Sequence, residues 1–382
     1  MSAFVYLDHA ATTPLAPEVA SAMAPYLAAE FGNPSARHPL GVRAAQALDR
    51  ARAQLARALL VPAAQVVFTS GGTEAANLAV LGLARASRPR HVLVGATEHA
   101  CVRACTAQLA REGFEVERIA LAAEGGVDLD AFARQLRPET ALVAHMAVNN
   151  EFGTIAPLAR MSKLMRARAK EARLVVDAVQ ALGKLDCAAS ELGWDALIVS
   201  AHKLGGPKGA GACVFARELA VQAIAFGGGQ EHGLRPGTEN VPAIVGFGAA
   251  VERAEAARAR NLTHVARLRA RMLEHLRALP GLRVIAPGEA VLPHILAFSA
   301  LGAPAEVVLH HLEQRGVYVS TGSACQTLSK SLSPGLSAIG LGEDEIRRVL
   351  RVSFGAETST EDVDAAARAL LDVAHELSGQ VS

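Results

Sequence analysis

Short apolar runs rich in β-branched residues alternate with Ala-rich segments from about residue 64 to residue 216, and this alternation limits the fold more than any other feature. The runs expected to be strands are Gln65–Thr69, His91–Ala96, Phe114–Leu121, Ala141–Val148, Arg173–Val179, Asp195–Ser200 and Gly211–Ala216. Helical spacing marks several segments between them, namely Glu74–Ala86, Cys101–Glu112 and Pro157–Ala172. Apolar strands that alternate with helices predict an α/β fold with a mainly parallel seven-stranded sheet covered by helices.

The chain of 382 residues is longer than one small core needs, which predicts two packed domains. We expect residues 15–250 to form the large, cofactor-binding domain around the sheet. A Gly-rich stretch at 225–240 and a long helical region at about 244–279 end the alternating pattern. Residues 1–14 and 251–382 are expected to form a smaller α+β C-terminal domain.

Charge and cysteine usage favour an enzyme that acts on small molecules. The formal net charge is +1, so no long-range field attracts nucleic acid or an anionic membrane. Five scattered cysteines do not form a disulfide framework in a chain of this length. The N-terminus has no secretory pattern, and no apolar run is long enough to span a membrane, so we expect a cytoplasmic protein.

Ligands of parallel sheets bind where the strands end at their carboxyl side, and the first such position has a Gly-rich turn. Ser70-Gly71-Gly72-Thr73 follows the first expected strand and precedes a helix. Gly72 allows a close approach of the backbone, Thr73 adds a hydroxyl, and a helix N-terminus binds anions, so this turn is a candidate phosphate site. An ordinary N-capped turn would have a similar sequence.

An acidic residue ends the fifth expected strand. Asp177 follows an apolar run, where a carboxylate is costly unless it is paired, and Gln180 lies three residues further on. A protonated ring nitrogen would be a suitable partner, as in the acid that pairs with the pyridine ring of pyridoxal phosphate. Asp177 could instead cap the following turn.

A lysine among glycines follows the sixth expected strand. A buried lysine amine can form a Schiff base with an aldehyde cofactor, and Lys203 is the candidate. Ser200 and His202 flank it and could bind a phosphate. A mobile surface loop whose lysines bind nothing is the alternative, and Lys208 fits that description.

His99 follows the second expected strand and could stack on a cofactor ring and later move protons as a catalytic residue, although a lone histidine is more often structural. A phosphate turn, an aromatic residue, an acid and a lysine therefore occur in that order at successive strand ends. Each feature is weak alone. Together they predict a pyridoxal-phosphate site.

The chain resembles the cysteine desulfurases of the class V aminotransferase group, which are fold-type I pyridoxal-phosphate enzymes. The resemblance runs nearly end to end and rests on matching motifs rather than on composition. These motifs include Tyr6–Pro14, Phe31–Ser35, Phe68–Glu74, Thr97–His99, Val148–Glu151, Val176–Gln180, Ser200–Lys203, Arg235–Thr238 and Gly322–Cys325.

The resemblance implies a role for each candidate residue. Lys203 would bind the cofactor and move the substrate α-proton, Asp177 would pair with the ring nitrogen, and Gln180 with the ring hydroxyl. The remaining assignments are His99 for ring stacking, Thr73, Ser200 and His202 for the phosphate, Thr238 for the phosphate of a partner subunit in a homodimer, and Asn150 and Arg351 for the substrate. A guanidinium fork matches a carboxylate, which suits Arg351.

Cys325 is the expected sulfur acceptor. It lies in Ser320–Gly335, a stretch of small and polar residues that is typical of a mobile surface loop. An exposed thiolate there can attack the substrate sulfur and carry a persulfide outward. The other four cysteines, Cys101, Cys105, Cys187 and Cys213, are expected to be structural, and no metal site is predicted.

The resemblance thus implies a homodimeric L-cysteine desulfurase that forms alanine and passes sulfur to an acceptor protein, most commonly for iron–sulfur cluster assembly. Selenocysteine lyase or another class V activity is the close alternative. A non-catalytic scaffold that keeps the fold is a further one, because fold alone does not establish function.

Overall fold

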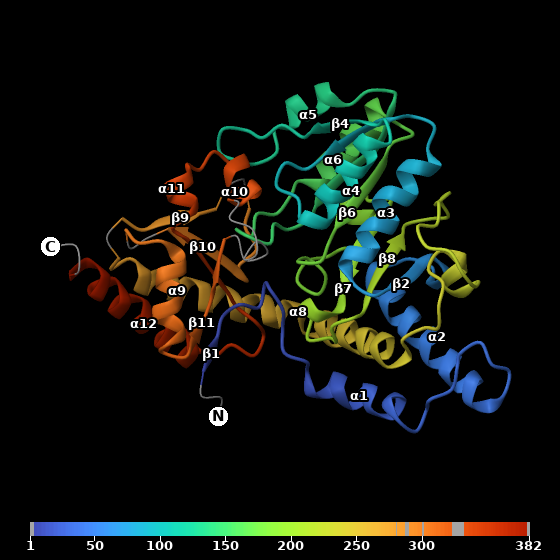
Figure 1. Ribbon diagram of the computed structural model, residues 1–382, viewed down its shortest axis with the longest axis horizontal. Coiled ribbons are helices and arrows are strands. Elements are labelled where there is room, and N and C mark those ends of the chain that lie inside the picture. Colours follow the sequence, from blue (N-terminus) through green and yellow to red (C-terminus); the bar gives the residue numbers. More distant parts are fainter. Residues whose placement is uncertain (1–3, 280, 287–289, 300–301, 323–331, 380–382) are drawn as a thin grey trace.

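Two β-sheets form the framework of the molecule. The computed structural model describes residues 4–279, 281–286, 290–299, 302–322 and 332–379. Within them, the larger sheet has the strand order β2-β8-β7-β6-β5-β3-β4 (Figure 1). Its strands are β2 (Val66–Thr69), β3 (His91–Val94), β4 (Glu115–Arg118), β5 (Thr140–Met146), β6 (Arg173–Asp177), β7 (Ala196–Ser200) and β8 (Gly211–Phe215). The predicted α/β class with a seven-stranded sheet is confirmed.

The direction of β8 distinguishes this sheet from a purely parallel one. β8 runs antiparallel to both of its neighbours, β2 and β7, whereas β7, β6, β5, β3 and β4 pair in parallel with one another. β2 therefore points the same way as β7. The carboxyl ends of six strands lie at one edge of the sheet, together with the amino end of β8.

Helices cover both faces of the larger sheet because side chains alternate along the strands. Val66 and Phe68 of β2 pack on one side, with α2 (Pro39–Leu59), α6 (Leu158–Arg168) and the first half of α8 (Val241–Leu276). Val67 packs on the other side, with α3 (Gly72–Ala86) and α4 (Ala100–Arg111). Six of the strands are thus largely buried on both faces, as their apolar runs predicted, whereas β4 at the sheet edge is partly exposed.

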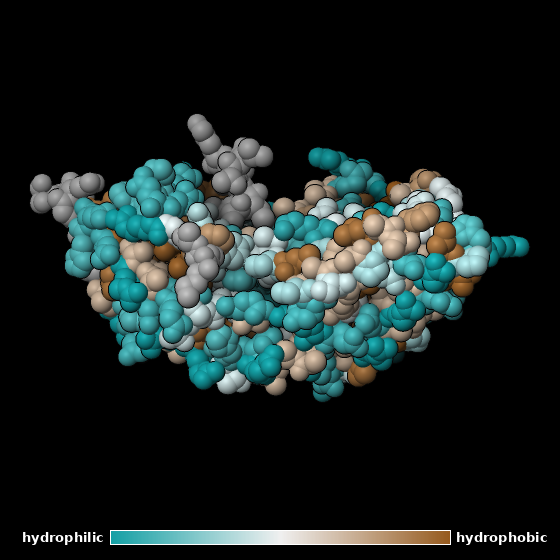
Figure 2. Space-filling view, turned by 90° about the horizontal axis from the view of Figure 1, so that it is seen from below, coloured by the Kyte–Doolittle hydropathy of each residue, from teal (hydrophilic) through white to brown (hydrophobic). Residues whose placement is uncertain are grey.

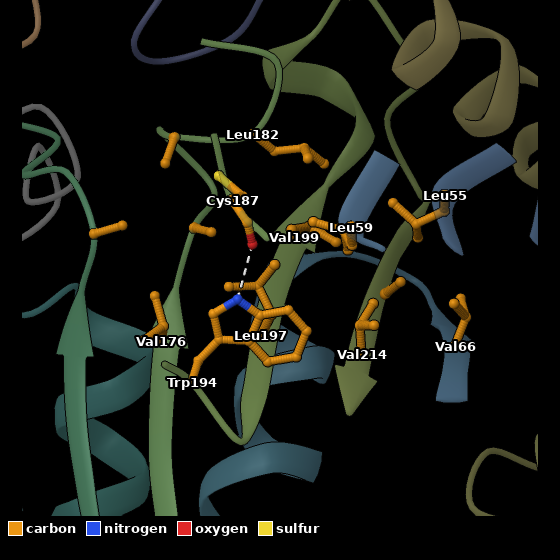
Figure 3. Packing of buried hydrophobic residues seen from close by; sticks show 14 of the residues in the cluster. Leu55, Leu59, Val66, Val176, Leu182, Cys187, Trp194, Leu197, Val199 and Val214 are labelled. Atoms are coloured by element: carbon orange, nitrogen blue, oxygen red, sulfur yellow. Dashed lines mark hydrogen bonds between the residues drawn. The ribbon is translucent and has the colours of Figure 1, made fainter. Parts of the chain in front are cut away.

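Trp194 fills the core between the sheet and the first of these helical layers. Its side chain is fully buried among Val176, Leu197 and neighbouring residues, and its indole N–H donates to the carbonyl of Cys187 at 2.8 Å (Figure 3). The one polar atom of the ring is therefore satisfied inside an apolar cluster.

The smaller sheet is antiparallel, with the order β12-β13-β10-β9. Its strands are β9 (Arg283–Ile285), β10 (Ile295–Ser299), β12 (Ser320–Thr321) and β13 (Val349–Ser353). One face packs on α9 (Ala305–Glu313), α12 (Thr360–Gly379) and the second half of α8. The remaining elements are β1 (Val5–Tyr6), α1 (Pro17–Leu27), α5 (Leu129–Gln135), α7 (Ala189–Leu192), β11 (Val317–Tyr318), α10 (Pro334–Ala338) and α11 (Glu343–Ile346).

The long helix α8 joins the two cores. Its residues up to Ala254 pack in the core of the larger sheet, whereas Val265 and later residues pack in that of the smaller sheet. The predicted domain boundary at residue 250 falls inside α8 and stays a prediction. None of the helices among the described residues combines the length and the apolarity of a membrane span.

The N-terminal segment runs from the smaller sheet to the larger one. β1 pairs in parallel with β11, and Leu7 lies in the core of the smaller sheet. The backbone N–H of Ala10 then donates to Ser353 Oγ at 2.8 Å, and that of Thr13 donates to the carbonyl of His202 at 2.9 Å. These contacts bring residues 10–13 to the carboxyl edge of the larger sheet.

Gly211 provides a test of how closely β8 approaches the turn after β2. A Cβ atom at this position would lie 2.6 Å from the backbone of Gly71. We therefore expect Gly211→Ala to lower the free energy of unfolding by about 1–3 kcal/mol, because overpacking displaces backbone. Urea unfolding followed by Trp194 fluorescence measures this change.

Gly342→Ala is the matched control. Open space surrounds Gly342, and its φ of −72° suits alanine. Gly342 is the N-cap of the short helix α11, where alanine is less favourable than glycine, so we expect a cost below about 1 kcal/mol. Equal effects of the two substitutions would contradict the close approach.

Candidate functional site

A cavity of about 290 Å³ lies at the carboxyl edge of the larger sheet. Such a volume is close to the lower end, roughly 300 Å³, of small-molecule sites. Ten residues singled out in the sequence line it: Gly72, Thr73, His99, Asn150, Asp177, Gln180, Ser200, His202, Lys203 and Arg351. The parallel direction of the strands brings these side chains together, since most of them follow the ends of β2, β3, β5, β6 and β7.

Lys203 lies in a turn of 3₁₀-helix that begins directly after β7. Its Nζ donates to the carbonyl oxygens of Ala10 and Ala11, at 2.5 and 2.6 Å. Backbone carbonyls, which only accept hydrogen bonds, therefore hold the amine at the cavity wall. Both carbonyls belong to the N-terminal segment, which gave no sequence signal for this role.

Asp177 is buried at the end of β6. Its Oδ1 accepts the backbone N–H of Val179 at 2.9 Å, which is the capping contact that the sequence left open as an alternative. Burial raises the pKa of the Asp177 carboxyl, and a hydrogen bond and the nearby cations oppose that change only in part. A cationic partner in the cavity would favour the ionised form.

Other residues of the cavity wall carry donors suited to an anion. α3 begins at Gly72, and Thr73 follows in its first turn. The hydroxyl-bearing Ser200 ends β7, and His202 Nδ1 lies 3.1 Å from Thr12 Oγ1. Burial and three nearby lysines lower the pKa of His202 to about 4, so the ring is neutral and keeps a single N–H at neutral pH.

Arg351 projects from β13 of the smaller sheet and is almost fully buried. Its Nη2 donates to Asp8 Oδ1 at 2.8 Å, and its Nη1 donates to the carbonyl of Asn150 at 2.8 Å. Its Nε is buried and has no hydrogen-bond partner among the described residues. The guanidinium is thus oriented at the cavity, with its charge balanced by one carboxylate.

Cys101, which the sequence analysis left as structural, lines the same cavity. Its Sγ lies 3.0 Å from His99 Nδ1, and its backbone N–H donates to that nitrogen at 3.3 Å. Since Nδ1 accepts the backbone N–H, the ring proton is on Nε2. The position of Cys101 two residues after His99, in the first turn of α4, was the signal that could have identified it.

Glu98 is a buried acid beside the cavity that the sequence analysis did not assign. Its Oε1 accepts the backbone N–H of Met146 at 2.5 Å, and its Oε2 has no hydrogen-bond partner among the described residues. Burial, followed by the nearby Asp177 carboxyl, raises the pKa of Glu98 to about 8. Glu98 is therefore mostly protonated at neutral pH, which limits the negative charge close to Asp177.

The structure does not place two of the predicted site residues, Thr238 and Cys325, in the wall of this cavity, for different reasons. Thr238 is exposed and is not part of the cavity wall. Cys325 lies outside the described residues. The segment that holds Thr238 is linked to the turn at residues 70–74, because Arg235 Nε donates to Glu74 Oε1 at 3.2 Å. Glu74 Oε2 in turn accepts the backbone N–H of Ser70 at 2.6 Å. No group of three possible metal ligands occurs in the described part of the chain.

Comparison with known proteins identifies the class. The aminotransferase class-V family matches residues 5–366, and the chain belongs to this family. Its relatives include a cysteine desulfurase IscS from Dictyoglomus turgidum, 37% identical over 363 residues that cover 94% of this chain and 92% of the relative. The predicted resemblance to cysteine desulfurases is thereby confirmed.

Solved structures agree with this assignment. A NifS-like protein superposes with a TM-score of 0.91 at 32% identity, covering 98% of this chain and 99% of that chain. SspA in complex with cysteine superposes with a TM-score of 0.79 at 32% identity, covering 92% of this chain and 98% of that chain.

The raised pKa of Glu98 predicts a specific pH dependence of stability. The pKa of the Glu98 carboxyl has its usual value of 4.5 in the unfolded chain and is raised to about 8 in the folded protein, so between these pH values the folded state binds one more proton. Stability therefore falls as pH rises across this window. Glu98→Gln cannot ionise at this position. As pH rises, we expect its free energy of unfolding to increase relative to that of the wild type by at most about 1.4 kcal/mol per pH unit.

Urea unfolding of both proteins at several pH values between about 5 and 8 measures the difference. Glu252→Gln is the control, because that side chain is largely exposed. Parallel pH profiles for wild type and Glu98→Gln would show that Glu98 ionises normally in the folded protein.

Proposed function

We propose that this chain is a pyridoxal-phosphate-dependent L-cysteine desulfurase that forms L-alanine and transfers the sulfur to Cys325 as a persulfide. One observation carries the proposal. A single cavity joins the amine of Lys203, the buried carboxyl of Asp177, anion-binding groups at the start of α3 and the guanidinium of Arg351. The named activity of relatives that match over nearly the whole chain supports the same conclusion.

The residues present fit the cofactor. Asp177 is a buried acid whose raised pKa the nearby cations offset only in part, and a protonated pyridine nitrogen would be a further cationic partner for it. Gly72, Thr73, Ser200 and His202 would hold the phosphate, and His99 would lie against the ring. When bound, the cofactor acts as an electron sink that acidifies the substrate α-carbon and weakens the bond to its sulfur.

Arg351 and Asn150 would bind the amino acid. A guanidinium that is oriented by Asp8 and by the carbonyl of Asn150 can pair with the substrate carboxylate through two donors. Because Arg351 is buried, this pairing is less screened by solvent than a surface ion pair. Arg351 and Lys203 line the same cavity, so a substrate held by its carboxylate would present its α-carbon to Lys203, whose Nζ would remove and return the α-proton.

Cys325 would accept the sulfur. Its thiolate would attack the substrate sulfur, form the new S–S bond and leave the electron pair of the broken Cβ–S bond on the substrate carbon. Protonation of that carbon gives alanine, so the step needs no external oxidant or reductant. The persulfide would then pass to an acceptor protein, such as an iron–sulfur scaffold, and we propose a cytoplasmic location for this transfer.

We further propose a homodimer in which Thr238 contributes to the partner subunit's phosphate site. Several large apolar side chains are exposed: Leu15, Leu27, Phe31, Val42, Leu60 and Phe226. Apolar residues gather on the half of the molecular surface that holds α1 and α2 (Figure 2). Large exposed apolar patches commonly mark protein interfaces, and the exposure of Thr238 leaves it accessible to a partner.

Substitution of Cys325 separates sulfur transfer from cofactor binding. We expect Cys325→Ala to lower alanine formation from cysteine by about 100-fold or more, because the nucleophile is lost. Its visible absorption band from the lysine-bound cofactor should remain, whereas Lys203→Ala should lose both. Cys105→Ala, which removes a buried thiol away from the cavity, is the control. Full activity of Cys325→Ala would refute the acceptor role.

A mixed dimer tests the position of Thr238. Thr238→Ala and Lys203→Ala homodimers should both be impaired at limiting cofactor. If Thr238 acts across the interface, a dimer with one subunit of each kind has one site in which both Lys203 and Thr238 are intact. If Thr238 acts within its own chain, the mixed dimer has no such site. About half of the randomly re-associated dimers are mixed, so if one of the two sites in each of these is intact, we expect about a quarter of the wild-type activity to return. No recovery would place Thr238 in the site of its own chain.

A further inference from the structure

The orientation of the Gln180 side chain is determined by two contacts. Its Nε2 donates to the carbonyl of Ala10 at 2.9 Å. Because a carbonyl only accepts, the amide nitrogen must face Ala10, and the amide oxygen must face the opposite side. There, His294 Nε2 lies 3.2 Å from Gln180 Oε1. The amide oxygen only accepts as well, so the His294 ring must carry its proton on Nε2.

His294 is held in the one form that can make this contact. It precedes β10 of the smaller sheet and is buried. Burial, with the nearby cations Lys184, Arg351 and Lys203, keeps the pKa of His294 well below its usual value, so the ring is neutral and has a single N–H. Its Nδ1 has no hydrogen-bond partner among the described residues, which leaves the proton for Nε2.

We infer that His294 is a positioning residue that holds the Gln180 amide with its nitrogen toward the cofactor cavity. This inference rests on the proposed function. One N–H of the amide is used by Ala10, and the second is then available to the ring hydroxyl oxygen of pyridoxal phosphate, since Gln180 lines the cavity. A flipped amide would place oxygen against the Ala10 carbonyl and N–H against the His294 N–H.

The contact between His294 and Gln180 also links the two sheets beside the cavity. Gln180 follows β6 of the larger sheet, whereas His294 precedes β10 of the smaller one. A hydrogen bond between them makes the donor geometry in the cavity depend on how the two sheets pack. A histidine that merely filled the core would lack this dependence.

The affinity of cofactor-depleted protein for pyridoxal phosphate, measured by equilibrium dialysis, tests the inference. His294→Leu keeps the side-chain volume but leaves Gln180 Oε1 buried without a donor. We expect about 5- to 30-fold weaker binding. His294→Gln, which restores an N–H donor, should stay within about 3-fold of the wild type. Thermal unfolding of each variant checks that it is folded.

A double-mutant cycle separates positioning from a structural role. If His294 acts through Gln180, His294→Leu should change the affinity by less than about 2-fold in a Gln180→Ala background. His91→Leu is the matched control, because His91 is also buried but lies at the amino end of β3, where its Nδ1 is 2.9 Å from Thr140 Oγ1, and does not contact Gln180.

The possible outcomes test the proposed function and the role of His294 separately. A wild type that does not bind pyridoxal phosphate would refute the proposed function. A wild type that binds, with His294→Leu binding equally well or with an effect that adds in full to that of Gln180→Ala, would refute the role of His294 alone. An equal loss in His91→Leu would assign the effect to general destabilisation of the protein.

Discussion

The common direction of six strands in the larger sheet is the constraint on which the site depends. Parallel strands place their carboxyl ends at one edge, so a single polar residue after each strand is enough to assemble a site. β8 runs the other way and presents its amino end there, where Gly211 leaves room for the turn at Gly71. The apolar strands are fully buried, and the polar groups gather just beyond them.

Backbone carbonyls of the N-terminal segment provide hydrogen-bond acceptors for the polar side chains of the site. The carbonyl of Ala10 accepts from both Lys203 Nζ and Gln180 Nε2. Two residues earlier, Asp8 pairs with the buried Arg351 of the smaller sheet. A short extended segment therefore contacts the amine, the amide and the guanidinium of the site. Buried charges require such partners, because an unpaired charge in the interior is strongly destabilising.

Sequence reasoning could identify the strands and the residues that follow them, because apolar runs and isolated polar residues are local signals. It placed the ends of several strands too late. Ala96, Val148 and Val179 lie beyond β3, β5 and β6, since the chain turns there to form the cavity wall. The direction of β8 could not be predicted, because an apolar strand has the same pattern in either direction.

The contributions that were missed come from distant segments or from atoms without a sequence signature. Ala10 and Ala11 act through their carbonyls, and His294 reaches Gln180 from 114 residues away. Cys101 and Glu98 flank His99, and only the folded structure shows which of them lines the cavity.

The ion pair between Asp8 and Arg351 spans 343 residues and so has a consequence for biosynthesis. A ribosome that adds about 5–20 residues per second needs roughly 17–70 seconds to make that length of chain. The larger sheet, which ends at Phe215, can form during this time. The first residues to be synthesised, in contrast, reach their final positions only after β13 has emerged. The cavity is therefore one of the last parts of the nascent protein to form.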